Sequence, residues 1–175
     1  TGGSDALAAN RAWSDNVTAL EEQLKRQGFN AGDIRRLPQS LSDTWANGGN
    51  LPPAGQRFRA NGGVVVETDK VDQVDQASRS TESFVAAGIV LDNSYVRYFF
   101  TDLNRIKPGM LKTATASARE AADTFAKDSG VTVGSMKSAT QGLFSIASPV
   151  SDYDAESSLM KKVRVVTRVQ YFIGE

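Results

Sequence analysis

The chain has 175 residues, with 20 lysines and arginines against 20 aspartates and glutamates, and it contains neither cysteine nor histidine. This length is within the usual range of one domain and allows roughly 70% of the unfolded surface to be buried, so a core needs no disulfide or metal. The two missing residue types exclude thiol catalysis, thiolate zinc sites and histidine general bases. We expect no cofactor, although a carboxylate-only calcium or magnesium site stays open.

The charge balance and the hydropathy limit the partners. Nucleic-acid-binding proteins usually carry a basic excess, and this chain has none, so we predict no nucleic-acid partner. No run of about eighteen apolar residues is long enough to span a membrane. The start Thr1-Gly2-Gly3-Ser4 lacks an initiator methionine and is typical of a processed or engineered end. This leaves open a membrane anchor in a segment outside this sequence.

The first predicted element is a helix from residue 5 to about residue 27. Ser4 or Asp5 is a plausible N-cap, and Gly28 is a natural stop because glycine tolerates the left-handed conformation. One apolar stripe follows the helical period, formed by Leu7, Trp13, Val17, Leu20 and Leu24.

A β-hairpin is predicted next, with strands over residues 34–45 and 57–68. Its connection, residues 47–55, is rich in glycine, proline and asparagine. Pro38 predicts an edge or a bend, and Asn61-Gly62-Gly63 predicts a bulge. The valine run at 64–66 suits a buried strand.

The middle of the chain predicts a helix over residues 70–87 ended by Gly88, and then a strand over residues 91–101. The strand prediction depends on tyrosine, valine and phenylalanine between positions 95 and 100. A third, alanine-rich helix is expected from about Pro108 to Ser129, with Gly130 as its stop.

Two strands close the chain, over residues 134–146 and 162–173. In the second strand, the odd-numbered positions from 163 to 173 carry apolar residues and one threonine. The even-numbered positions carry arginines and glutamine, together with Val166 and Phe172. An antiparallel sheet covered by helices on one face requires this alternation. We therefore predict a single α+β domain over residues 1–175, with helices packed on one face of a mostly antiparallel sheet.

Three stretches of the second half together carry a resemblance. The first runs from Ala118-Arg119 through Phe125-Ala126 to Val133-Gly134, the second is Gln-Gly-Leu-Phe-Ser-Ile at 141–146, and the third is Lys-Lys-Val-Arg-Val-Val-Thr at 161–167, followed by Tyr-Phe-Ile at 171–173. In their order and spacing they resemble the SIMPL-domain family, bacterial exported or envelope-anchored proteins that include an immunogenic periplasmic antigen. The likeness extends more weakly upstream over most of the chain.

The resemblance implies an extracytoplasmic location, a sheet-and-helix domain and assembly into homo-oligomers. It supplies no catalytic residues that map onto this sequence. Family members usually have a strand before the first helix, preceded by a signal or an anchor. Here the chain opens almost directly into the helix, so we expect that strand to be missing and its place in the sheet to be empty.

Several residues are candidates for a ligand site or an interface. Arg164 and Arg168, with Lys161 and Lys162, indicate either an anion site or a solvated strand face whose charges discourage edge pairing. Trp45 is either a partner anchor or part of the hairpin packing. A pocket between the alanine-rich helix and the sheet is expected around Phe125, Phe144 and Tyr171.

The leading hypothesis is a non-enzymatic envelope or periplasmic protein that acts by self-assembly or binding, with a link to stress response. The alternative is a small-ligand-binding module that uses the pocket beside the alanine-rich helix. A third hypothesis is a hydrolase whose carboxylates meet only in the fold, such as Asp102 with Glu120 or Asp123.

Overall fold

The computed structural model describes residues 1–46 and 56–174 and divides into two compact units, Thr1–Val96 and Arg97–Glu175. Each unit is described by itself. The single domain expected from the sequence stays a prediction. The α+β class is confirmed, and every ladder among the described residues is antiparallel. The strands of the described ranges form three separate sheets where one was expected.

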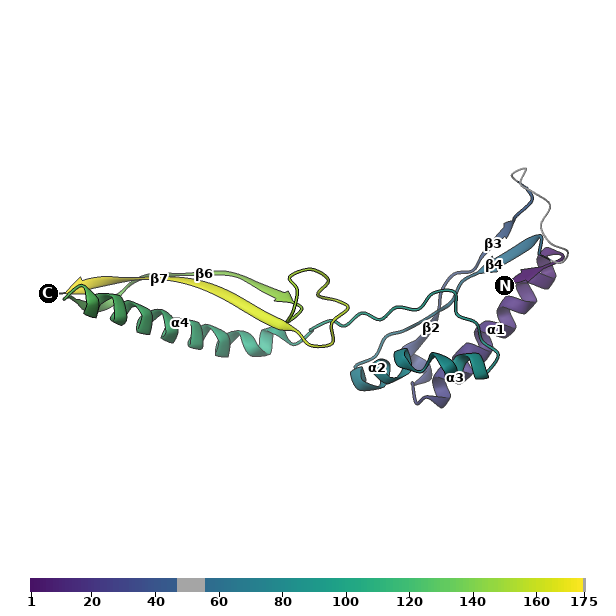
Figure 1. Ribbon diagram of the computed structural model, residues 1–175, viewed down its shortest axis with the longest axis horizontal. Helices are drawn as coiled ribbons and strands as arrows, with labels where there is room; N and C mark the ends of the chain where they lie inside the picture. The colour runs from purple at the N-terminus through teal and green to yellow at the C-terminus, as the bar shows by residue number, and fades with distance from the viewer. Residues whose placement is uncertain (47–55, 175) are drawn as a thin grey trace. The chain divides into compact units, whose positions relative to one another are not determined.

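The N-terminal unit contains most of the elements (Figure 1), and its buried cluster is formed where the helices pack on the short sheet of β2 and β5. In chain order these elements are β1 (Gly2–Gly3), α1 (Ala6–Arg26), η1 (Ala31–Asp33), β2 (Ile34–Arg36), β3 (Ser40–Asp43), β4 (Phe58–Asn61), β5 (Val64–Val66), α2 (Val71–Arg79) and α3 (Thr81–Ala86).

Helix α1 confirms the first predicted element. The Asp5 side chain accepts a hydrogen bond from the Ala8 N–H at 2.8 Å, as an N-cap does. Gly28 has φ of +92°, and the Phe29 N–H donates to the Leu24 carbonyl. This glycine stop turns Phe29 into the core beside Leu24.

The predicted hairpin forms, with β2 paired to β5 and β3 paired to β4, and it is interrupted at Pro38. Three residues, 37–39, lie opposite two, 62–63, so the extra residue is on the Pro38 side and the bulge predicted at Asn61-Gly62-Gly63 is wrong. The connection predicted at 47–55 lies outside the described residues. At Gly62 the Trp13 ring lies so close that an added Cβ would be 2.9 Å from two ring atoms. Packing against Trp13 therefore favours glycine at this position.

A two-residue strand, β1, precedes the first helix and pairs with β4. Whether the first strand of the family is missing stays a prediction. The Ala60 N–H donates to the Thr1 carbonyl at 2.9 Å, and the Thr1 amino group donates to the Ala60 carbonyl at 3.2 Å. The sequence pattern missed this strand because glycine has low strand propensity. At Gly3 a Cβ would lie 2.5 Å from the Ala9 nitrogen, so a glycine is needed where the strand turns into α1.

The helix predicted over residues 70–87 is two helices, α2 and α3, divided at Ser80. Ser80 has φ of −100° and ψ of 43°, and its hydroxyl donates to the Gln76 carbonyl at 2.8 Å. A serine that hydrogen-bonds the backbone in this way competes with the helical pattern. The break lets α3 place Phe84 against Leu24, Phe29 and Ile89, which are the buried cluster of this unit.

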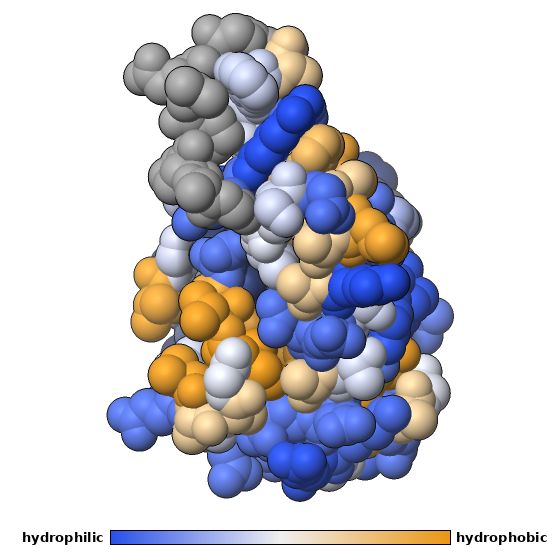
Figure 2. Space-filling view, turned by 90° about the vertical axis from the view of Figure 1, so that its right-hand side faces the viewer, coloured by the Kyte–Doolittle hydropathy of each residue, from blue (hydrophilic) through white to orange (hydrophobic). Residues whose placement is uncertain are grey.

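The surface of the N-terminal unit is mixed. Viewed from the side of this unit, hydrophilic residues cover most of the surface, with groups of apolar residues among them (Figure 2). None of the helices in the described ranges is long and apolar enough to span a membrane.

The strand predicted over residues 91–101 is wrong, since these residues belong to no strand in the structure. Strand propensity reports how well a side chain fits a pleated surface, and it cannot supply a neighbouring strand. The Tyr98 N–H donates instead to the Glu156 carbonyl at 2.7 Å, in the loop between the last two strands.

The C-terminal unit is one long helix, α4 (Leu103–Asp128), beside a two-stranded hairpin of β6 (Thr132–Ala147) and β7 (Lys162–Gly174) (Figure 1). The last two predicted strands are confirmed, with slightly longer bounds. Helix α4 begins five residues before Pro108, which lies in its second turn. There the ring nitrogen cannot donate to the Asn104 carbonyl, a local cost that the rest of this long helix outweighs.

A candidate interface and groove in the C-terminal unit

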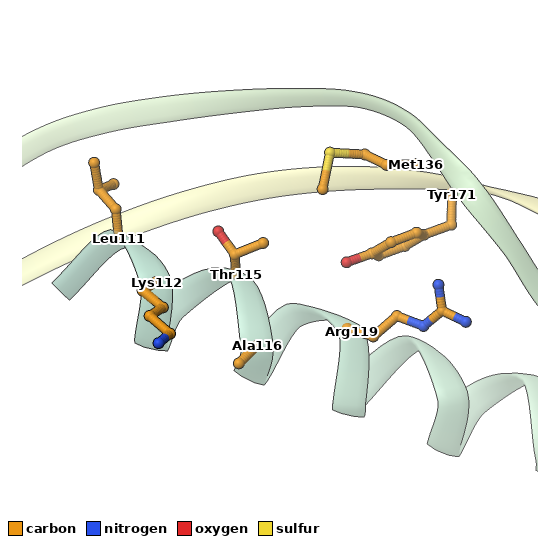
Figure 3. Close-up of a pocket in the computed structure, with 7 residues that line it drawn as sticks. All are labelled: Leu111, Lys112, Thr115, Ala116, Arg119, Met136 and Tyr171. Carbon is orange, nitrogen blue, oxygen red and sulfur yellow. The ribbon is translucent and has the colours of Figure 1, made fainter. Parts of the chain in front are cut away.

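The hairpin of the C-terminal unit has two different faces. Along β7, half-buried residues alternate with exposed ones. Tyr171 belongs to the half-buried row and projects toward α4 (Figure 3). Because side chains in a strand alternate between faces, the rest of that row also faces α4, namely Val163, Val165, Thr167 and Val169. The opposite face carries Lys162, Arg164, Val166, Arg168, Gln170 and Phe172.

Arg119 ties α4 to the start of β6 and to β7. Its guanidinium donates to the Val133 and Gly134 carbonyls, both at 2.9 Å, and pairs with Asp123 on the same helix at 3.2 Å. The same group lies 5.2 Å from the centre of the Tyr171 ring. A planar guanidinium can make such contacts at once because its donors form a rigid fork and its face stacks on aromatic rings.

A shallow groove of about 560 Å³ lies beside this arginine, between α4 and the hairpin (Figure 3). Five of its residues come from α4, one from β6 and one from β7: Leu111, Lys112, Thr115, Ala116, Arg119, Met136 and Tyr171. Two cations and no carboxylate line it. The groove therefore has an apolar wall with a positive rim, which suits a small organic anion better than a cation.

Of the three residues predicted to surround a pocket here, only Tyr171 lines the groove. Phe125 is 74% exposed on α4. Phe144 is half-buried and lies opposite Val165 of β7. Val165 is six residues from Tyr171, so Phe144 and Tyr171 are about 20 Å apart along the hairpin. The Lys107 ammonium lies over the Phe144 ring, 5.6 Å from its centre. The sequence analysis placed the aromatic residues correctly on this helix and hairpin but could not order them along the length of the hairpin.

Sequence reasoning gave Arg119 no part in a site and treated it as a motif residue alone. The available signal was the pairing of Arg119 with Asp123 one turn later on a helix. Leu111, Thr115 and Met136 gave no signal, because a groove of this kind is defined only when helix and hairpin come together.

The basic residues of β7 lie on the face turned away from α4. Arg164 and Arg168 are exposed, and neither forms an ion pair with a residue in the described ranges. Lys162 lies 3.9 Å from Asp152. Lys161 instead donates to the Ala155 and Ser158 carbonyls of the loop before β7, so it belongs to that loop and not to the arginine face.

Trp45 belongs to the N-terminal unit, at the end of β3. Its ring lies 5.2 Å from the Arg57 guanidinium, which also lies 5.0 Å from the Phe58 ring. Arg57 in turn pairs with Asp43 at 2.8 Å, and this contact lowers the pKa of the Asp43 carboxyl. Trp45 is 45% exposed, so the contact with Arg57 still leaves much of the ring open to solvent.

The carboxylates proposed for a hydrolase do not meet. Asp102 immediately precedes α4 and makes no side-chain capping hydrogen bond, while Glu120 and Asp123 lie in the second half of this helix. At a rise of 1.5 Å per residue, the separation between Asp102 and either acid is about 27–32 Å. Asp102 pairs with Arg105 at 2.5 Å, and among the described residues no group of three or more acids is arranged to hold a metal ion.

The C-terminal unit is thus an α-helix packed on an antiparallel hairpin, with a groove between them. A family model described as "SIMPL: Protein of unknown function (DUF541)" matches residues 1–171. This chain belongs to the SIMPL family, as the motifs in its second half indicated. No match to a curated protein was found.

Proposed function

We propose that this protein is a non-enzymatic protein of the bacterial envelope that acts by assembling with copies of itself. The proposed location is the periplasm, either free or anchored to the membrane and facing the periplasm, with a role linked to stress response. The location follows from the family resemblance, and the stress link is part of the functional hypothesis. The assembly is supported by an observation on the C-terminal unit itself.

That observation is the lack of buried apolar side chains in the C-terminal unit. Among its described residues, 97–174, Ser148 alone is buried, and the buried apolar residues of the chain all lie in the N-terminal unit. Several large apolar residues of α4 and the hairpin are strongly exposed, including Phe125 at 74%, Leu143 at 93% and Ile173 at 76%. A two-stranded hairpin depends on packing against another element for its stability, and the packing against α4 leaves these apolar groups in water. Exposed apolar groups of this extent are typical of a surface that another chain covers.

The experiment is the absolute mass of the full chain by light scattering coupled to size exclusion, over a hundredfold range of concentration. Self-assembly predicts a mass that rises to a defined multiple of 18.8 kDa. A mass of one chain at every concentration would refute the proposed function. Fractionation of bacterial cells tests the location separately, because the proposal predicts recovery with the periplasm or the envelope.

The second candidate function, binding of a small ligand, is favoured by the groove beside Arg119. The groove has Leu111, Met136 and the Tyr171 ring as apolar surface and Lys112 with Arg119 as cations. An aromatic carboxylate matches this combination, because its ring can stack on Tyr171 while its charge meets a cation.

Benzoate is a suitable probe for this second function. Titrated into the full chain, it is expected to shift the methyl resonance of Met136 and the amide resonance of Thr115. Lys112→Met should weaken the binding, whereas Lys127→Met, a change on the same helix outside this groove, should leave it unchanged. Equal binding by both variants, or no shift at Met136, would refute a ligand site in this groove.

A further inference from the structure

The two strands of the C-terminal hairpin present very different edges. Strand β6 is irregular at three places along its ladder, between Val133 and Met136, between Met136 and Ser138, and between Gln141 and Phe144. At each place the extra residue lies on β6. For example, Val133 pairs with Ile173 and Met136 pairs with Tyr171, so two residues of β6 lie between these pairs but one residue of β7. Bulges of this kind twist an edge strand away from further pairing.

Backbone carbonyls at the start of β6 also already bind a side chain of α4. The Val133 and Gly134 carbonyls both accept hydrogen bonds from Arg119. Acceptors that already bind a guanidinium are less available to a neighbouring strand. The β6 edge is therefore poorly suited to pairing with another chain.

Strand β7, by contrast, is regular over its full 13 residues. Its residues follow one another in the ladder without an insertion, and in the described part of the chain β7 pairs only with β6. Its row facing α4 contains no charged residue. A long, regular strand edge with an apolar inner row is the kind of surface that pairs with another strand.

We propose that β7 pairs antiparallel with β7 of a second copy, about a two-fold axis at Thr167, to form a four-stranded sheet from two hairpins. This inference rests on the proposed self-assembly and specifies its contact surface. A second copy is the fitting occupant because an edge of one chain that meets the same edge of another forms a closed, isologous contact.

The antiparallel direction follows from the two faces of β7. A two-fold axis perpendicular to the sheet keeps the apolar rows of both copies on one face and the arginines on the other. A parallel pair related by an axis along the strands would put the apolar row of one copy beside the arginine row of its partner. The antiparallel pair also places both α4 helices on one face of the sheet. The combined width of two helices, each about 10 Å wide, matches the width of four strands spaced about 4.8 Å apart.

The charges of the outward face restrict the register. An axis at Arg168 would place Arg168 of each copy directly opposite its equivalent, and an axis at Val166 would place Arg164 opposite Arg168. Like charges directly opposite are destabilising. An axis at Thr167 avoids both clashes, because Val166 then lies opposite Arg168 of the partner and Arg164 opposite its Gln170. The arginines therefore oppose wrong registers without preventing the pairing.

The inner row supports the same register. With the axis at Thr167, the threonines of the two copies are opposite each other, and Val165 lies opposite Val169 of the partner. Val163 then lies opposite Tyr171 of the partner. Threonine pairs and pairs of aromatic with β-branched residues are favourable across antiparallel strands. An axis at Val169 also avoids like charges, so the two registers must be distinguished by experiment.

The first test changes one exposed residue to either sign of charge. Val166 is 56% exposed, so Val166→Glu and Val166→Lys should both fold, as far-UV circular dichroism of the full chain would verify. In the proposed register each copy places residue 166 opposite Arg168 of its partner. Val166→Glu should tighten self-association and Val166→Lys should weaken it, each by about 2- to 30-fold from two equivalent pairs. Sedimentation equilibrium gives both constants.

The second test uses single cysteines, which are unambiguous because the chain has none of its own. Thr167→Cys should form a disulfide-linked dimer on mild oxidation, since the two side chains are directly opposite. Arg168→Cys is the matched control on the neighbouring residue, because the two sulfurs would be too far apart in this register. Preferential cross-linking of Val169→Cys would move the axis to Val169 and overturn the proposed register.

The outcomes separate this inference from the proposed function. An oligomer that responds oppositely to the two Val166 variants and cross-links through Thr167→Cys supports both. An oligomer that ignores the charge at position 166 and does not cross-link at position 167 overturns the β7 contact and leaves self-assembly standing. A wild-type chain that stays monomeric overturns both.

Discussion

Replacing Phe84 with alanine tests whether the N-terminal unit depends on its small buried cluster. Phe84 is 6% exposed and packs with Leu24, Phe29 and Ile89. The adjacent residue on α3, Val85, is 66% exposed. Phe84→Ala therefore removes a buried ring, whereas Val85→Ala removes methyl groups that are largely in water already.

The expected magnitude follows from this burial. Truncating a buried phenylalanine to alanine costs about 3–5 kcal/mol, through lost transfer free energy and the cavity that remains. Few other buried side chains are available to collapse into that cavity. The control Val85→Ala should change the free energy of unfolding by about 0.5 kcal/mol or less.

Urea denaturation followed by tryptophan fluorescence is the suitable assay. Both tryptophans of the chain, Trp13 and Trp45, lie in the N-terminal unit, so the signal reports the unit that contains Phe84. Phe84→Ala should lower the midpoint strongly, with Val85→Ala close to wild type. A loss below about 1 kcal/mol for Phe84→Ala would refute the assignment of this cluster as the core of the unit.

Two further predictions concern the same unit. The Arg36 guanidinium lies 2.6 Å from Glu21 and lowers the pKa of the Glu21 carboxyl below its ordinary 4.5. The ion pair therefore stabilises the fold above pH 4.5. This stabilisation is lost as the pH falls through the pKa of Glu21 in the folded state. Glu21→Gln should therefore lower the free energy of unfolding by about 0.5–1 kcal/mol at neutral pH, and the difference from wild type should vanish in acid. A difference that stays constant across a pH series would contradict the ion pair as its cause. Gly62→Ala should cost about 1–3 kcal/mol by pressing a methyl group against Trp13, and wild-type stability in thermal unfolding would show that the ring moves aside freely.

Much of the local structure followed from the sequence alone. The caps of α1, the glycine stops and the alternation of β7 are local patterns, in which each residue's conformation depends on near neighbours. The family could also be identified from three short motifs, because their order along the chain is visible without a fold. The helix break at Ser80 and the position of α4 relative to Pro108 were missed, since weak local preferences compete there with packing.

Other features depended on contacts between distant residues. The two glycines of β1 carry no strand pattern and form a strand only because β4 offers its edge. Residues 91–101 have the composition of a strand but belong to none, because composition does not provide a partner ladder. The groove likewise needed the structure, which brings Met136 and Tyr171 over the helix at Arg119. The sequence by itself determined the elements whose caps and periodicity are local, such as α1 and the two strands of the C-terminal hairpin. Only the tertiary structure decided which edges and faces meet, because that depends on packing between residues far apart in the chain.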